Sequence, residues 1–193
     1  MKVGTIYKGK SEIHSIIFNR VWAMPNAWTF KIGPIKELLG RYVGDGYNWV
    51  DPFAGKNSPA RTTNDHNPEM KEFYKREGQL HSTMEAVEFA KKVSHTKGFA
   101  GVIFDPPYSF RQISEHYKVI GKKAGRLDTS SNFYEKVKSV LCEKVHIGGH
   151  VISFGWNSNG FGKKRGYKII EILLVSHGGS KNDTIVTVEQ RIK

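Results

Sequence analysis

Apolar runs that end in polar turns recur along the chain, and stretches with helical spacing of apolar residues lie between them. Short runs rich in β-branched and aromatic residues, bounded by glycine, proline or asparagine, predict strands. We expect strands at Asn48–Asp51, Arg61–Asn64, Ala100–Phe104, His150–Phe154, Tyr167–Ser176 and Thr184–Gln190.

Helical spacing recurs between these strands. Pro34 stands at a first-turn position, and Ile35, Leu38 and Leu39 follow on one side of the same pattern. Other segments likewise place apolar residues on one face among charged ones. The sequence predicts helices at Pro34–Tyr42, from Asn67 to near Gly78, at Ser82–Val93 and at Asn132–Val145.

The order of these elements predicts the class of fold. Strands that alternate with helices build a mainly parallel sheet with helices on both faces. The last two strands are joined only by the glycine-rich turn HGGSKND, so they are expected to form a C-terminal antiparallel hairpin. No repeat, low-complexity tract or linker divides residues 1–193, which predicts a single α/β domain.

Composition narrows the class of protein. Of 193 residues, 38% are hydrophobic, and no apolar run is long enough to span a bilayer or to form a signal peptide. The single cysteine, Cys142, excludes an internal disulfide, and the histidines lack metal-ligand spacing. We therefore expect an intracellular, cytoplasmic protein with no structural metal and no membrane partner.

The charge balance points to a partner. Lysine and arginine number 30 against 18 acidic residues, which gives a net charge of +12 and a pI near 9.7. A strongly basic chain favours polyanions, and nucleic acid is the commonest polyanion inside cells. A soluble basic protein without such a partner is the alternative.

Three of the expected strands end in acid-bearing corners. The corners are Asp51–Gly55 (DPFAG), the pair Asn64 and Asp65, and Asp105–Tyr108 (DPPY). Because ligands of an open α/β sheet bind at the carboxyl ends of the strands, these corners are expected to line one site. The alternative for each acid is that it only caps the amides of its own turn.

The first two corners predict the kind of ligand. Gly55 lets a ligand approach the backbone closely, and an acid placed like Asp65 commonly holds ribose hydroxyls. The first loop lacks both a Gly-x-Gly-x-x-Gly pattern and a Walker lysine, so a diphosphate is not expected. A nucleoside without phosphates fits better.

Two of these motifs carry a resemblance to a known family. DPFAG followed by FDPPYS resembles the S-adenosylmethionine-dependent amino-methyltransferases, above all those that methylate adenine N6 in DNA. The segments MPNAWTFKI and PYSFRQISEHY are similar to small phage-encoded members, which implies the cytoplasm of a host cell. The resemblance implies a Rossmann-like methyltransferase fold, S-adenosyl-L-methionine as cofactor, and a catalytic motif of Asp105, Pro106, Pro107 and Tyr108.

The same resemblance assigns the cofactor contacts. DPFAG matches the motif that cradles the methionine part of the cofactor, and TFKIGPIKELL resembles an additional cofactor motif. MEAVEFAKK resembles the segment whose acid contacts the cofactor adenine. With Asp65 as the ribose partner, the expected set is Phe30, Lys31, Ile32, Asp51, Pro52, Phe53, Ala54, Gly55, Asp65 and Glu85.

The residue types of the DPPY corner suit amine methylation. The exocyclic amine of adenine is a poor nucleophile because its lone pair is delocalised into the ring. Asp105 and the carbonyl of Pro106 can each accept one N–H bond, which favours a pyramidal nitrogen whose lone pair points at the sulfonium methyl. The prolines fix the backbone, and Tyr108 offers a ring on which an extruded base stacks.

Other chemistries fit the sequence less well. Methylation of cytosine C5 needs a thiolate, and Cys142 lies in an expected amphipathic helix without a Pro-Cys motif. The family branch that methylates the cytosine amine usually has serine where Asp105 stands. Two alternatives stay open: an RNA methyltransferase acting at adenine N6 or guanine N2, and a nucleic-acid-binding relative with weak turnover.

The chain departs from the family pattern in three places. The loop between Asp51 and Asp65 is too short for the helix that the family places there. Ser82 and Glu85 match a Ser-x-x-Glu capping box, a role that competes with cofactor contact. Only residues 109–149 are free to read a target, so no separate target-recognition domain is expected.

Two basic, glycine-bearing clusters are expected to bind the phosphates of DNA, or of RNA. Surface lysines in solvated loops are the alternative. Because phosphate contacts position a strand without reading its bases, we expect low sequence specificity. The clusters are Lys118, Lys122, Lys123 and Arg126, and Lys163, Lys164 and Arg165.

Overall fold

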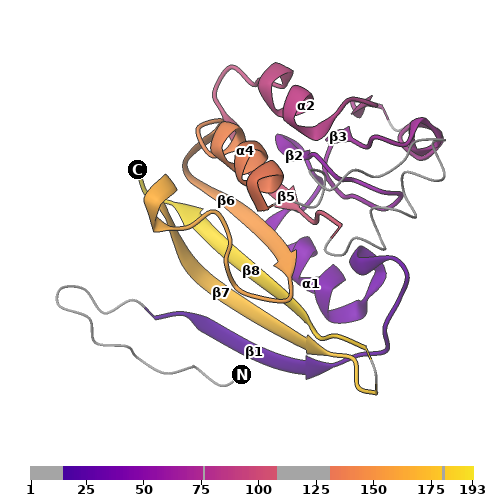
Figure 1. The fold of residues 1–193 in the computed structure, drawn as a ribbon, viewed down its shortest axis with the longest axis vertical. Coiled ribbons are helices and arrows are strands. Elements are labelled where there is room, and N and C mark those ends of the chain that lie inside the picture. Colours follow the sequence, from indigo (N-terminus) through magenta and orange to yellow (C-terminus); the bar gives the residue numbers. More distant parts are fainter. Residues whose placement is uncertain (1–14, 76, 108–130, 180) are drawn as a thin grey trace.

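The computed structural model describes residues 15–75, 77–107, 131–179 and 181–193. They form one eight-stranded sheet with the order β1-β7-β8-β6-β5-β2-β3-β4 (Figure 1). The strands are β1 Ile17–Trp22, β2 Trp49–Asp51, β3 Thr62–Asn64, β4 Leu80–Ser82, β5 Phe99–Phe104, β6 Val145–Gly155, β7 Tyr167–Ser176 and β8 Thr184–Arg191. The helices are η1 Thr29–Lys31, α1 Gly33–Tyr42, η2 Pro68–Phe73, α2 Ala86–Lys92, α4 Ser131–Leu141 and η3 Lys163–Arg165, where η marks a 3-10 helix.

The strand directions confirm a mainly parallel sheet. Every neighbouring pair is parallel except the two pairs that include β8. The expected C-terminal hairpin is formed by β7 and β8. Seven strands therefore deliver their carboxyl ends to one edge of the sheet, which from here on is called the carboxyl edge.

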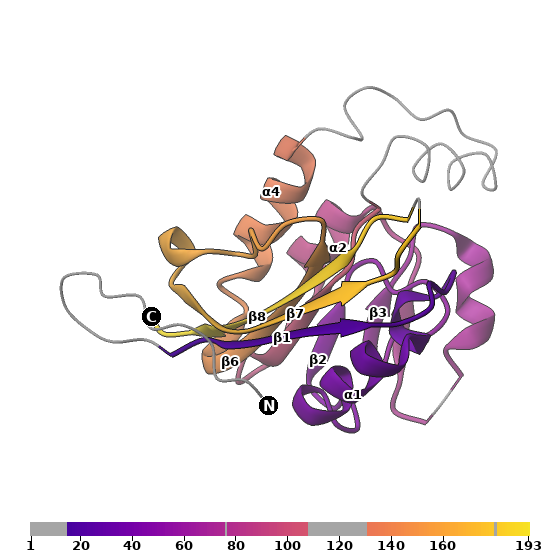
Figure 2. The ribbon, with the colours of Figure 1, turned by 90° about the horizontal axis from the view of Figure 1, so that it is seen from below.

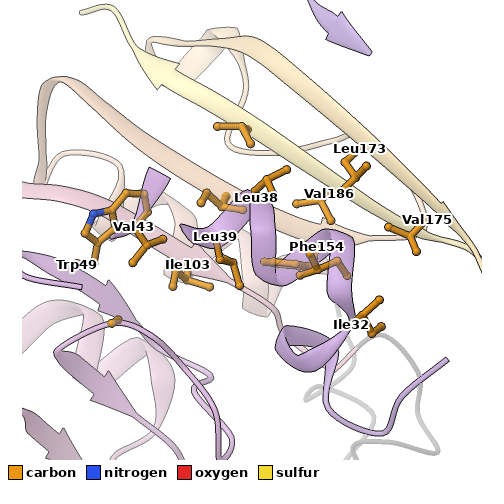
Figure 3. Close-up of a cluster of buried hydrophobic side chains, with 14 residues drawn as sticks. Ile32, Leu38, Leu39, Val43, Trp49, Ile103, Phe154, Leu173, Val175 and Val186 are labelled. Atoms are coloured by element: carbon orange, nitrogen blue, oxygen red, sulfur yellow. The ribbon is translucent and has the colours of Figure 1, made fainter. Parts of the chain in front are cut away.

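Helices cover both faces of the sheet, as predicted (Figure 2). α1 packs on one face, and α2 and α4 pack on the other. On the first face, Leu38 and Leu39 of α1 lie in one buried cluster with Ile103 of β5 and Val186 of β8 (Figure 3). Burying a side chain of this size contributes about 1.5–3 kcal/mol. These contacts fix the central strands whose ends form the candidate site.

Several elements differ from the prediction. β1 and β4 were not expected, because these edge strands are short or mostly exposed and lack a buried apolar run. The helix expected from Asn67 is only the short η2. The helix expected from Ser82 begins at Ala86, since Ser82 pairs with Asn64 as part of β4. Val145 starts β6 and does not belong to α4.

The loop from β2 to β3 contains no helix, as its length predicts. β2 and β3 are nevertheless adjacent and parallel, with Asp51 opposite Thr63. In the described ranges, no helix is both long and apolar enough to cross a membrane.

Candidate active site at the carboxyl edge

The first corner is built around Asp51, which is completely buried at the end of β2. Its Oδ1 accepts a hydrogen bond from the amide of Phe53 (2.9 Å), and its Oδ2 accepts one from the hydroxyl of Ser58 (2.6 Å). The side chain of Asp51 thereby holds both Phe53, at the start of the loop, and Ser58, further along it. Sequence reasoning did not find Ser58, because no local pattern marks a hydroxyl that reaches back to a strand end.

Burial raises the pKa of Asp51 to about 7, although the bonds from Ser58 and from the Phe53 amide favour the ionised form. The negative charges of Asp105 and Asp65 raise this pKa further. Such an effect needs proximity, so the three acid corners predicted from the sequence come together. In the described ranges no three His, Cys, Asp or Glu side chains are grouped so as to hold a metal ion.

Asp51→Asn tests the buried carboxylate. The folded protein binds the Asp51 proton more tightly than the unfolded chain, whose pKa is near 3.8. The free energy of unfolding should therefore fall as pH rises from about 4 to about 7. Asparagine retains the contacts without titrating, so the variant should lose this fall, by up to about 1.4 kcal/mol per pH unit. Urea unfolding at about pH 5 and about pH 7 measures the difference.

Asp45→Asn is the matched control. Asp45 likewise accepts a hydrogen bond from the amide two residues later, that of Tyr47 (2.9 Å), but its side chain is exposed. This variant should keep the wild-type pH profile. An Asp51→Asn profile parallel to that of the wild type would mean that Asp51 is already ionised throughout this range.

Asp65 joins the second corner to the first. Its Oδ2 accepts a hydrogen bond from the amide of Gly55 (3.0 Å), and its Oδ1 accepts one from the amide of Asn67 (2.8 Å). Gly55 has a φ of +53°, and a Cβ built on it meets no atom within 4 Å. The backbone at Gly55 therefore faces open space, which a loop that receives a ligand at close range requires.

Tyr74 supports the same loop from the segment after η2. Its buried hydroxyl lies 2.9 Å from the carbonyl oxygen of Ala54, to which it donates, and accepts a hydrogen bond from the amide of Ser58 (3.2 Å). Its ring stacks on His81 of β4, with 4.7 Å between centroids. The side chain of Tyr74 thus braces a loop that contains no helix.

Glu85, the acid expected at a cofactor adenine, lies at the start of α2. The capping-box alternative is wrong, because Ser82 belongs to β4 and donates its hydroxyl to Oδ1 of Asn64 (2.8 Å). Glu85 itself makes no capping hydrogen bond to α2. Its Oε1 lies 3.3 Å from Nδ1 of His66, beside Asp65. Contact between Glu85 and a ligand stays a prediction.

The corner after β5 holds the expected catalytic residues. Asp105 is half-buried and Pro106 is buried. Tyr134 of α4 donates its hydroxyl to the carbonyl of Pro107 (2.6 Å), and its ring meets Phe53 edge-on at 5.9 Å between centroids. One tyrosine therefore holds this corner next to the loop after β2. Nothing in the sequence pattern marked Tyr134 for this position.

The upstream segment of the expected cofactor motif precedes α1. Phe30 is partly buried, and its ring lies 5.2 Å from that of Phe154 between centroids. Ile32 is 5% exposed and belongs to the core beneath the sheet (Figure 3), whereas Lys31 is exposed. The segment is thus anchored by Phe30 and Ile32, and its contact with a cofactor stays a prediction.

One expected phosphate-binding cluster forms η3. It lies beside the C-terminal half of α4, around a hollow that Cys142 and Arg191 also line, at the end of the strands away from the acid corners (Figure 1). Arg165 is paired with Glu135 (2.6 Å), whereas Lys163 and Lys164 are exposed. The remaining expected residues lie outside the described residues: Tyr108, Lys118, Lys122, Lys123 and Arg126.

Solved structures share this arrangement of elements. The N-methyltransferase NodS from Bradyrhizobium japonicum WM9 aligns over 82% of this chain and 94% of its own, with a TM-score of 0.55 and 9% identity. The 1,6-didemethyltoxoflavin-N1-methyltransferase from Burkholderia thailandensis, solved with S-adenosylhomocysteine, aligns over 83% of this chain and 78% of its own, with a TM-score of 0.56 and 10% identity. An rRNA methylase from Streptococcus thermophilus aligns over 81% and 94%, with a TM-score of 0.53 and 9% identity.

No family model matches the chain, and no curated protein matches it in sequence. At identities this low, structural similarity establishes the fold and not the activity. The described residues have the Rossmann-like methyltransferase fold that the sequence predicts.

Proposed function

We propose that this protein transfers the methyl group of S-adenosyl-L-methionine to N6 of an adenine extruded from the base stack of DNA. One observation carries the proposal: the Asp51–Gly55 loop, Asp65 and the Asp105–Pro107 corner meet at a single edge of the sheet. The fold shared with methyltransferase structures, one of them with S-adenosylhomocysteine bound, supports it. The net charge of +12 supports a polyanionic substrate.

The residues around the first loop fit the cofactor. The open space at Gly55 would admit its methionine part against the backbone, Asp65 would hold its ribose hydroxyls, and Glu85 would meet its adenine. The buried and half-buried acids Asp51 and Asp105 favour a ligand with cationic ammonium and sulfonium groups. When bound, the cofactor supplies an electrophilic methyl group on a positively charged sulfur.

The corner after β5 would hold the adenine amine. Asp105 and the carbonyl of Pro106 each accept one N–H bond, which directs the nitrogen lone pair toward the methyl group. The bond from Tyr134 to the Pro107 carbonyl keeps this backbone in place, and Tyr108 would stack on the base. Transfer is one in-line displacement helped chiefly by positioning. The methylated amine then releases its extra proton to Asp105 or to water.

Nucleoside analysis tests the proposal. The purified protein is incubated with cofactor labelled in the methyl group and with either DNA or RNA, and each polymer is digested to nucleosides. Label in deoxyadenosine is the expected result. Label confined to adenosine or guanosine of the RNA would move the function to RNA. Absence of label from both would favour a binding protein without turnover.

Methylation of a long DNA should occur at many adenines, with preference for a neighbouring base or two at most. A reader of several base pairs delivers side chains to a groove from a rigid element, each good bidentate pair adding about 1–3 kcal/mol. Only residues 108–130 lie between the corner after β5 and α4, too few for a separate domain. Sequencing that maps methylated adenines checks this. Modification confined to one longer defined site by the purified protein would contradict it.

A further inference from the structure

The exposed tryptophans all lie at the carboxyl edge. The chain has four tryptophans, of which Trp49 is buried and Trp22, Trp28 and Trp156 are 63%, 38% and 52% exposed. Trp22 ends β1, Trp156 directly follows β6, and Trp28 directly precedes η1. These exposed rings therefore gather at the same edge of the sheet as the acid corners, and a grouping of exposed apolar side chains marks a candidate interaction site.

The strand order shows how far this row extends. Trp22 pairs with Ser176 of β7, and its indole Nε1 lies 3.3 Å from the Cβ position of Gly178, in the turn after β7. Four strand steps, by way of β7, β8 and β6, separate β1 from β5. At about 4.8 Å per step, the strands β1 and β5 lie roughly 19 Å apart across the sheet. β6, which leads to Trp156, is the direct neighbour of β5.

Trp28 extends the row past the first corner. The ammonium of Lys56, next to Gly55, lies 5.1 Å from the ring centroid of Trp28 and 4.7 Å from that of Phe73 in η2. Phe73 is itself 49% exposed. Two rings that hold one cation between them offer both stacking faces and a partner for a phosphate.

The loop that carries Trp156 is held from two sides. Lys138 of α4 donates to the carbonyl of Gly160 (3.1 Å), and the buried Glu189 of β8 accepts from the amide of Phe161 (2.5 Å). An aromatic side chain on an anchored loop loses little conformational freedom when a ligand stacks on it.

We propose that Trp22, Trp156, Trp28 and Phe73 form a track for an unpaired polynucleotide, so that single-stranded DNA is the preferred substrate. The inference rests on the proposed function for the identity of the polymer. Consecutive unpaired bases each offer a face to an aromatic ring, and basic residues neutralise the phosphates between them. In a duplex these faces are covered, and one extruded base beside Asp105, after β5, cannot also stack on Trp22, which ends β1 four strand steps away. The net charge of +12 fits such a strand.

Titration with oligonucleotides in the absence of cofactor tests the track. Tryptophan fluorescence is followed while an oligo(dT) strand, or a duplex of the same length, is added at low salt. Because oligo(dT) contains no adenine, the result is independent of turnover. The strand should quench fluorescence and bind more tightly than the duplex. Trp22→Ala and Trp156→Ala should each weaken strand binding about tenfold and leave duplex binding unchanged.

Tyr47→Ala and Leu80→Ala are the controls. These side chains are 65% and 68% exposed, and they lie at the amino ends of the parallel strands, before β2 and at the start of β4, away from the carboxyl edge. Both should bind the strand like the wild type. Equal affinity for duplex and strand, or unchanged strand affinity in Trp22→Ala, would overturn the track. Methyl transfer is measured separately. If the protein binds strands through these rings but transfers no methyl group, the track is supported and the proposed function is contradicted.

Discussion

Asp105→Ala is expected to lower the rate of methyl transfer by about 10²-fold or more and to leave the fold and most of the cofactor binding intact. The substitution removes a charged acceptor from the amine on which positive charge develops. Asp105 is half-buried, and the bond between Tyr134 and Pro107 supports the corner independently of it. Single-turnover transfer of labelled methyl groups measures the rate, and calorimetry with S-adenosylhomocysteine measures binding.

Asp105→Asn is the companion variant, because its amide oxygen preserves one neutral acceptor in a side chain of similar size. Its rate should fall between those of the wild type and Asp105→Ala. Asp45→Ala, in the exposed turn between α1 and β2, should transfer at the wild-type rate. If Asp105→Ala unfolds, or retains near-normal turnover, Asp105 is a structural cap and its catalytic assignment is wrong.

Gly55→Val is expected to abolish measurable binding of S-adenosylhomocysteine. A side chain at this position would occupy the open space beside the loop, where the methionine part of the cofactor needs close approach to the backbone. The amide of Gly55 is also held by Asp65, so a shift of the loop would move the expected ribose partner. Calorimetry on the wild type and the variant gives the two affinities.

Backbone strain must be separated from blocked space in this experiment. Gly44→Val serves as the control, because Gly44 has a φ of +60° and, like Gly55, has no atom within 4 Å of a built Cβ. A β-branched residue at positive φ costs about 1–3 kcal/mol at either position. Gly44 lies in the turn after α1, away from the acid corners, so its variant should lose stability and retain affinity. Equal affinities in the two variants would place the ligand elsewhere.

The central strands were predictable because their residues are buried on both faces. Val102, Ile103 and Phe104 of β5 form a short apolar run that ends at an acid, and burial of all three confirms the expected strand. β1 and β4 lie at the two edges of the sheet, where Trp22 and Leu80 are exposed. Edge strands form through pairing with a neighbouring strand, and no local sequence pattern predicts which segment that neighbour is.

The acid corners were predictable, whereas the side chains that hold them were not. Asp51, Asp65 and Asp105 each follow a recognisable strand, so topology alone brings them to one edge. The hydroxyls of Tyr74 and Tyr134 reach these corners from other segments, and tertiary packing alone determines their partners.

The capping-box pattern at Ser82 and Glu85 predicted a helix start where the structure has a strand. Ser82 and Glu85 have the spacing of a helix start, but pairing of Ser82 with Asn64 in the sheet extends the backbone there instead. Pairing between strands that are distant in the sequence therefore outweighed the local helix-capping pattern.

Mass analysis of nucleosides tests the central claim, methylation of the adenine amine, most directly. Single-stranded DNA is incubated with the purified protein and a cofactor whose methyl group carries deuterium, and is then digested. The expected product is labelled N6-methyl-2′-deoxyadenosine, formed by the wild type and about 10²-fold more slowly by Asp105→Ala. Label in a cytosine nucleoside, or equal yields of labelled deoxyadenosine from the wild type and Asp105→Ala, would contradict the account.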